Sequence, residues 1–187
     1  IPTEGITKIP AADFEYAKAA DSTIKLLGRS RAIDDNTAEV MVAPFLLSKE
    51  HPLAMVHGVF NAVFVTGNML GDSMYYGRGA GKLPTASAVV SDGIDCARHQ
   101  GKVIMCFWDK EEVKLADIGE PERSFFVRAK EGAEVAVEAA FPGGRMIRVA
   151  DRKEDFGYFT PVMKEKEFLA KYEALGEQML GRIRCVS

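Results

Sequence analysis

The chain has 187 residues, of which 47 % are hydrophobic and 27 % are charged, and its formal net charge is −3. This balance is typical of a folded globular protein, and the length allows one large or two small domains. The slightly acidic charge argues against nucleic acid and against an anionic membrane surface as partners. No apolar run approaches the ~18 residues of a membrane span, and no signal-peptide pattern is visible.

Cysteine and histidine residues give no sign of a disulfide framework or a metal site. The cysteines are odd in number and widely spaced, which favours buried thiols in a reducing cytoplasm. The histidines lack the spacing of known zinc motifs, and no cysteine pair supports them. We therefore predict a cytoplasmic protein with no metal ligands. The residues concerned are Cys96, Cys106, Cys185, His51, His57 and His99.

The first fifty residues predict a helix followed by two strands. A short helix is expected from Asp13, with Asp13 as its N-cap. The run 23–30 reads as a strand, and the polar cluster 34–36 reads as a turn. The returning strand is expected at 38–43, where Pro44 would end it.

Residues 51–76 predict a hairpin. A short helix at 51–56 precedes an apolar strand at 62–66, and a turn at Gly67-Asn68 leads to a second strand at 72–76. Short turns and alternation favour antiparallel pairing and an α+β layer.

A glycine loop then opens a helix. Gly77, Gly79 and Gly81 permit positive φ and close approach of a ligand to the backbone. Pro84 suits the first helical turn. The apolar residues that follow recur at helical spacing, so one face should pack on a core. This apolar face comprises Ala86, Val89, Val90, Gly93, Ile94 and Ala97.

Two readings of this loop remain open. The N-terminus of the helix can hold a phosphate or another anion, or the loop is only a flexible connection between a strand and a core helix. The Walker A spacing and the G-x-G-x-x-G fingerprint both fail here, since the loop reads G-x-G-x-G. A phosphate-transfer protein is therefore the weakest hypothesis.

The last third has a regular order of its own. Residues 100–122 read as a linker that contains a strand-like run at 103–108. After it we expect strands and helices in the order βαββαβ, which is typical of a ferredoxin-like arrangement. The expected elements are a strand at 124–128, a helix at 133–140, strands at 146–149 and 158–160, a helix at 165–179 and a strand at 182–186.

The strings "HPLAMVHGVFNAVFV" (51–65) and "YGRGAGKLPTASAVVSDGID" (76–95) resemble the C-terminal part of homoserine dehydrogenase. The segment that begins with "EGI" at residue 4 is similar to the same family. The resemblance implies part of the catalytic and dimerisation domain at 1–99, a linker at 100–122 and an ACT-like domain at 123–187. The fold class implied is α+β: a mixed, largely antiparallel sheet with helices on one face, then a ferredoxin-like domain.

Homoserine dehydrogenase interconverts L-homoserine and L-aspartate 4-semialdehyde with NAD(P). In the family, the catalytic lysine and the Rossmann fingerprint precede the "EGI" block, so the resemblance assigns no catalytic residue to this chain. It implies that Gly79 and Gly81 approach the nicotinamide end of the cofactor and that Asn61 lies in the block that shapes the cleft. Asn61 is equally readable as a strand-edge residue that bonds local backbone.

These features lead us to expect a fragment that is inactive alone, binds no cofactor by itself and forms a homodimer. The alternative is a stand-alone amino-acid sensor built on the ACT-like domain. That domain lacks most of the usual effector loop, because within Val127–Glu134 only Gly132 matches the acidic-x-Pro-Gly-apolar pattern. A structural brace is therefore expected rather than a threonine site.

Overall fold

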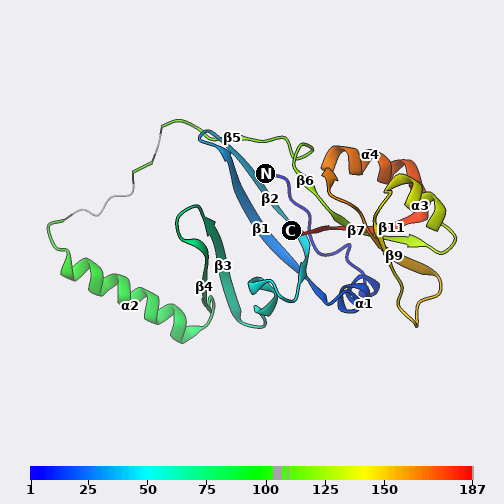
Figure 1. Ribbon diagram of the computed structural model, residues 1–187. Coiled ribbons are helices and arrows are strands. Elements are labelled where there is room, and N and C mark those ends of the chain that lie inside the picture. Colours follow the sequence, from blue (N-terminus) through cyan, green and yellow to red (C-terminus); the bar gives the residue numbers. More distant parts are fainter. Residues whose placement is uncertain (103–106, 109, 187) are drawn as a thin grey trace. The chain divides into compact units, whose positions relative to one another are not determined.

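The computed structural model describes residues 1–102, 107–108 and 110–186 (Figure 1). It divides into two compact units, one made of residues 1–50 with 112–187 and the other of residues 51–111. The sequence placed boundaries at 99 and 123 instead. The difference arises because the N-terminal hairpin and the C-terminal strands form one sheet. Cys106 and most of the strand-like run predicted at 103–108 lie outside the described residues.

The first unit is built on a seven-stranded mixed sheet. Most neighbours are antiparallel, as predicted, and only the β2–β11 and β2–β5 pairs are parallel. We expected a sheet followed by a separate ferredoxin-like domain, but the two share one sheet, because Arg184 of β11 pairs with Phe45 of β2. In spatial order the strands are β1 (Ser22–Asp34), β2 (Thr37–Ser48), β11 (Met179–Cys185), β7 (Phe125–Lys130), β9 (Asp155–Phe159) and β8 (Arg145–Ile147), with β5 (Lys114–Leu115) on β2.

Helices cover both faces of this sheet, not one face as expected. Successive residues of a strand point to opposite faces, so Phe125 and Phe126 belong to separate cores. Phe125 stacks on Phe168 with ring centroids 3.6 Å apart, in the core beneath the helices α3 (Glu134–Ala140) and α4 (Glu165–Leu175). Phe126 packs with Tyr16 of α1 (Ala11–Ala19) on the other face.

Two element ends differ from the sequence-based expectation. The last helix was expected to reach residue 179, but α4 stops at Leu175 because Gly176 takes a φ of +55°. A 3₁₀ turn, η2 (Gly176–Gln178), then leads directly into β11. Two short strands, β6 (Glu122–Arg123) and β10 (Met163–Lys164), pair with each other in a separate two-stranded sheet.

Pro44 does not end β2 as predicted. The N–H of Val42 donates to Pro2 O, on the edge of β2 that faces away from β1. Since every second residue points its N–H to the same edge, Pro44 directs its nitrogen away from β1. The missing donor therefore removes no bond of the β1–β2 ladder, where Pro44 pairs with Leu26.

Asp13 is a buried ion-pair partner rather than the predicted N-cap, a position that Pro10 takes. Its Oδ1 accepts from Arg128 Nε at 2.7 Å, and Arg128 also donates to Asp155 at 2.9 Å. Burial raises the pKa of Asp13. The hydrogen bond from Arg152 is the main reason that the pKa of Asp155 falls to about 2. This cluster ties α1 to β7 and β9.

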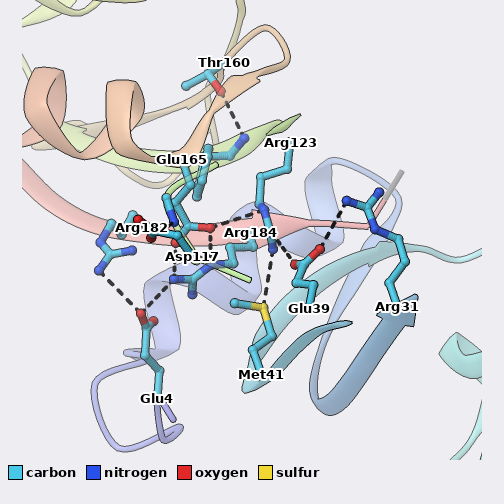
Figure 2. Close-up of polar contacts among 12 residues, drawn as sticks. Glu4, Arg31, Glu39, Met41, Asp117, Arg123, Thr160, Glu165, Arg182 and Arg184 are labelled. Carbon is cyan, nitrogen blue, oxygen red and sulfur yellow. Dashed lines mark hydrogen bonds and ion pairs between the residues drawn. The ribbon is translucent and has the colours of Figure 1, made fainter. Parts of the chain in front are cut away.

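A second ionic cluster, shown in Figure 2, joins residues from the two ends of the chain. Arg184 donates to buried Glu165 through Nε at 3.0 Å and to Glu4 at 2.9 Å. Arg123 contacts Glu39 of β2, and its Nε lies 3.2 Å from Glu165 Oε2 without forming a hydrogen bond. The hydrogen bond from Arg184 lowers the pKa of Glu4. Residues from the N-terminal segment, β2, β6, α4 and β11 thus meet in one network.

The second unit contains a hairpin and a helix. As predicted, β3 (Phe60–Gly67) and β4 (Gly71–Arg78) pair in antiparallel fashion. The short helix expected before them is a 3₁₀ turn, η1 (Pro52–Met55), whose first free N–H, on Leu53, donates to His51 Nδ1. The long helix is α2 (Lys82–Arg98).

The apolar face of α2 is not packed on a core, which contradicts the prediction for the part of the chain that the structure describes. Val89, Val90 and Ile94 are 66 %, 60 % and 48 % exposed, and no residue of α2 is buried. The helical period is right, but none of the described residues of 51–111 covers this face. Among all described residues, no helix has the length and apolar character that would let it cross a membrane.

Candidate functional site

The glycine loop joins the last residues of β4 to the first turn of α2. The register of the hairpin places Gly77 directly opposite Asn61 and Arg78 opposite Phe60. Directly opposed residues of a hairpin share one face, so Asn61 and Gly77 lie on the same face at the end that meets the loop. The loop therefore has one polar side chain beside it and glycines along its own backbone.

Gly81 is required by backbone conformation. It is the N-cap of α2 and has a φ of +124°, a value that residues with a Cβ rarely adopt. Its carbonyl accepts the Thr85 N–H at 3.1 Å, which closes the first helical turn around Pro84. The free N–H groups of this first turn carry the positive end of the helix dipole.

Gly79 lies close to the side chain of Asn61, and its φ lies outside the left-handed region. A Cβ on Gly79 would clash with Asn61 Nδ2 and would stand 2.8 Å from Asn61 Cγ. The two residues are separated by the whole hairpin in sequence. The motif alone therefore gave no sign of this contact, although the pairing of the two predicted strands could have revealed it.

Gly77 faces open space, because no heavy atom lies within 4 Å of the position that its Cβ would occupy. The backbone at Gly77 is therefore uncovered on this side. The opposite face of the hairpin is occupied by aromatic rings. Phe60 stacks on Tyr76 with centroids 4.7 Å apart, and the Arg78 guanidinium lies 5.4 Å from the Phe60 ring.

The histidines His51 and His99 make local contacts. His51 caps η1, and His99 Nδ1 lies 3.0 Å from the Asp95 carbonyl oxygen. In the residues that the structure describes, no three His, Cys, Asp or Glu side chains gather as metal ligands would. Lys82, at the start of α2, is exposed.

Comparison with known proteins identifies the family of this site. The model of the homoserine dehydrogenase family matches residues 1–94, which include the hairpin and the glycine loop. The homoserine dehydrogenase of Synechocystis sp. is 48 % identical over 98 residues, a match of 51 % of this chain and 23 % of that protein. That of Mycobacterium bovis is 38 % identical over 164 residues, covering 81 % of this chain and 36 % of that protein.

A solved structure agrees over almost the whole chain. The homoserine dehydrogenase of Thiobacillus denitrificans superposes with a TM-score of 0.77 and 28 % identity, covering 98 % of this chain and 47 % of that one. This chain thus spans about half the length of that structure and about a quarter to a third of the two curated relatives. Since the family model matches half of the chain and the structural likeness extends through the rest, the chain belongs to the homoserine dehydrogenase family.

Proposed function

We propose that this chain forms part of an enzyme that interconverts L-homoserine and L-aspartate 4-semialdehyde with NAD(P). The observation that carries the proposal is the glycine loop, which lies in the segment matched by the family model. There Gly77 leaves open backbone, and Gly81 turns the chain into the N-terminus of a 17-residue helix. An open backbone beside a helix N-terminus suits an anionic or planar group of a cofactor.

Within that enzyme, Gly79 and Gly81 would hold the nicotinamide end of the cofactor close to the backbone. Bound NAD(P) supplies the hydride chemistry. The residues of this chain bind and orient, and a misplacement of the order of 1 Å at such a wall costs a large factor in rate. The catalytic lysine and the Rossmann fingerprint belong to family segments that do not occur in this sequence. We therefore expect the chain alone to be inactive.

The C-terminal part is best described as a ferredoxin-like, ACT-like module. The order β7-α3-β8-β9-α4-β11 and the antiparallel sheet order β11-β7-β9-β8 support this assignment. In the loop where an ACT domain grips its effector, Arg148 pairs with Glu131 at 2.6 Å and with Glu134. The acidic groups of the loop are thus already neutralised, which favours a structural brace over a threonine site.

The exposed apolar faces support a homodimer. Val63 and Tyr75 on the hairpin are 61 % and 68 % exposed, and α2 carries the further apolar stripe described above. Exposed apolar side chains gathered on one element favour an interface. We place the enzyme in the cytoplasm with small molecules as substrates. The comparisons do not favour the alternative of a stand-alone amino-acid sensor.

The test is an assay of L-homoserine oxidation with NAD⁺ and NADP⁺. Two proteins are compared: this chain alone, and a protein that joins it to the family's Rossmann and lysine-bearing segments. Reduced cofactor should form only with the longer protein. Gly79→Val and Gly81→Val should each lower the rate of the longer protein strongly. Rates within about twofold of wild type, a difference of ~0.4 kcal/mol, would show that the loop does not contact the cofactor. Turnover by the chain alone would refute the assignment of the chemistry to other segments.

A further inference from the structure

Asn61 is a polar side chain that lies against the glycine loop. Its Nδ2 and Cγ occupy the space that a Cβ of Gly79 would need. It stands opposite Gly77, whose own Cβ position faces open space. Asn61 therefore lies at the boundary between the filled part of the loop and its open part.

The carboxamide of Asn61 has little to bond within the chain. Its Nδ2 reaches only the Val59 carbonyl oxygen, at 3.5 Å, which is at the limit of a hydrogen bond. No described residue donates to its Oδ1. One amide N–H of a terminal carboxamide group and its oxygen are thus available to a ligand at the loop.

We infer that Asn61 is a ligand-contacting residue of the cofactor site and that Gly79 is a glycine so that this carboxamide can lie over the loop. The inference rests on the proposed function, because it takes the cofactor as the ligand. The chemistry implied is a neutral hydrogen bond between the carboxamide and a polar group of the cofactor. A side chain at Gly79 would act indirectly: Asn61 is exposed and short, so it would turn away and lose that bond.

The effects of substituting Asn61 and Gly79 on cofactor binding should therefore depend on each other. If the cost of Gly79→Ala arises from displacing Asn61, then Asn61→Ala should abolish the additional effect of Gly79→Ala. If instead the added methyl group meets the cofactor itself, the two substitutions should act independently and their effects should multiply.

The experiment measures the dissociation constant of NADPH by nucleotide fluorescence, together with KM and kcat. The longer protein described above is used as wild type and as Asn61→Ala, Gly79→Ala and the double variant. Each single change should weaken NADPH binding roughly threefold to tenfold, the loss expected for one neutral hydrogen bond. The double variant should be no weaker than the worse single variant. Asn68→Ala, an asparagine in the turn at the far end of the same hairpin, is the matched control and should bind as wild type.

Two results would overturn the inference. One is NADPH binding by Asn61→Ala within twofold of wild type, and the other is multiplication of the two single effects in the double variant. Thermal midpoints of all variants are recorded. If the midpoint of Asn61→Ala falls below that of wild type, Asn61→Ser replaces it, because serine keeps a polar group on a shorter side chain. Failure of the proposed function itself looks different, since the wild-type protein would then neither bind NADPH nor oxidise homoserine.

Discussion

Arg184→Met should destabilise the first unit by about 3 kcal/mol, near the lower end of the range for breaking a buried ion pair. The Arg184 side chain is 5 % exposed and that of Glu165 is 1 % exposed. Without Arg184, the Glu165 carboxylate keeps only Arg123, whose Nε lies 3.2 Å away but makes no hydrogen bond. Glu4 is 42 % exposed, so the loss of its pairing adds less than ~1 kcal/mol.

The partner substitution separates a buried, unpaired charge from a general packing defect. Glu165→Met combined with Arg184→Met removes the carboxylate that the single variant leaves unpaired. We expect the double variant to regain roughly 1–2 kcal/mol relative to Arg184→Met, because apolar replacement of a whole buried pair is often nearly neutral. Arg182→Met is the matched control: Arg182 is 28 % exposed and 3.5 Å from Glu4, so its loss should cost no more than ~0.5 kcal/mol.

The assay is urea unfolding followed by far-UV circular dichroism at pH 7. A loss of ~3 kcal/mol lowers the midpoint by about 1–3 M for the usual range of m values. Hydrogen exchange of the β11 amides should accelerate in parallel, since this strand carries Arg184. The reasoning is refuted if Arg184→Met costs no more than Arg182→Met, or if the double variant is less stable than Arg184→Met.

Three further predictions concern pH, effector binding and assembly. The hydrogen bond from Arg152 holds the pKa of Asp155 in the folded state at about 2, below its ordinary value of 3.8. Its ionised form therefore stabilises the fold above about pH 4, and roughly 2 kcal/mol of the free energy of unfolding is lost as the pH falls to about 2. The free energy of unfolding measured against pH should show this loss in wild type and not in Asp155→Asn. Calorimetric titration with threonine should give no saturable binding in the sub-millimolar range, because Arg148 already pairs with Glu131 and Glu134, and a measurable site would exclude the brace. Light scattering at tens of micromolar should give twice the monomer mass of 20.5 kDa, whereas the monomer mass would contradict the homodimer.

Local patterns in the sequence predicted local structure well. The alternation and turn residues around Gly67 predicted the β3–β4 hairpin, and the glycine loop with Pro84 predicted the start of α2. The order of the C-terminal elements followed in the same way. Each of these features depends on residues within a few positions of one another, so the physical cause is present in a short window of sequence.

Long-range features were not predictable from such windows. The pairing of Arg184 with Phe45 joins strands from opposite ends of the chain, and no local pattern specifies a partner that distant. The apolar period of α2 shows that one face needs cover but does not identify what covers it. Asp13 resembles an N-cap because caps and buried carboxylates use the same residue type, and only the approach of Arg128 separates them.

The candidate site shows the same division. The sequence predicted that the loop glycines permit positive φ, and Gly81 has a positive φ. The Asn61 side chain fills the space beside Gly79, and the register of the two strands brings the two residues together. Pairing the two predicted strands about their turn implies this contact, whereas the glycine motif alone does not.

The central place of β11 has a consequence for synthesis on the ribosome. This strand lies between β2 and β7, yet it is made roughly 130 residues after β2, or about 7 to 26 s later at 5–20 residues per second. Until β11 emerges, the backbone of β2 at Phe45 and Leu46 lacks its partner strand and can pair with another chain. The nascent chain therefore passes through an interval in which the β1–β2 hairpin is complete but this part of its edge is open to aggregation. Chaperone binding during that interval would favour correct assembly.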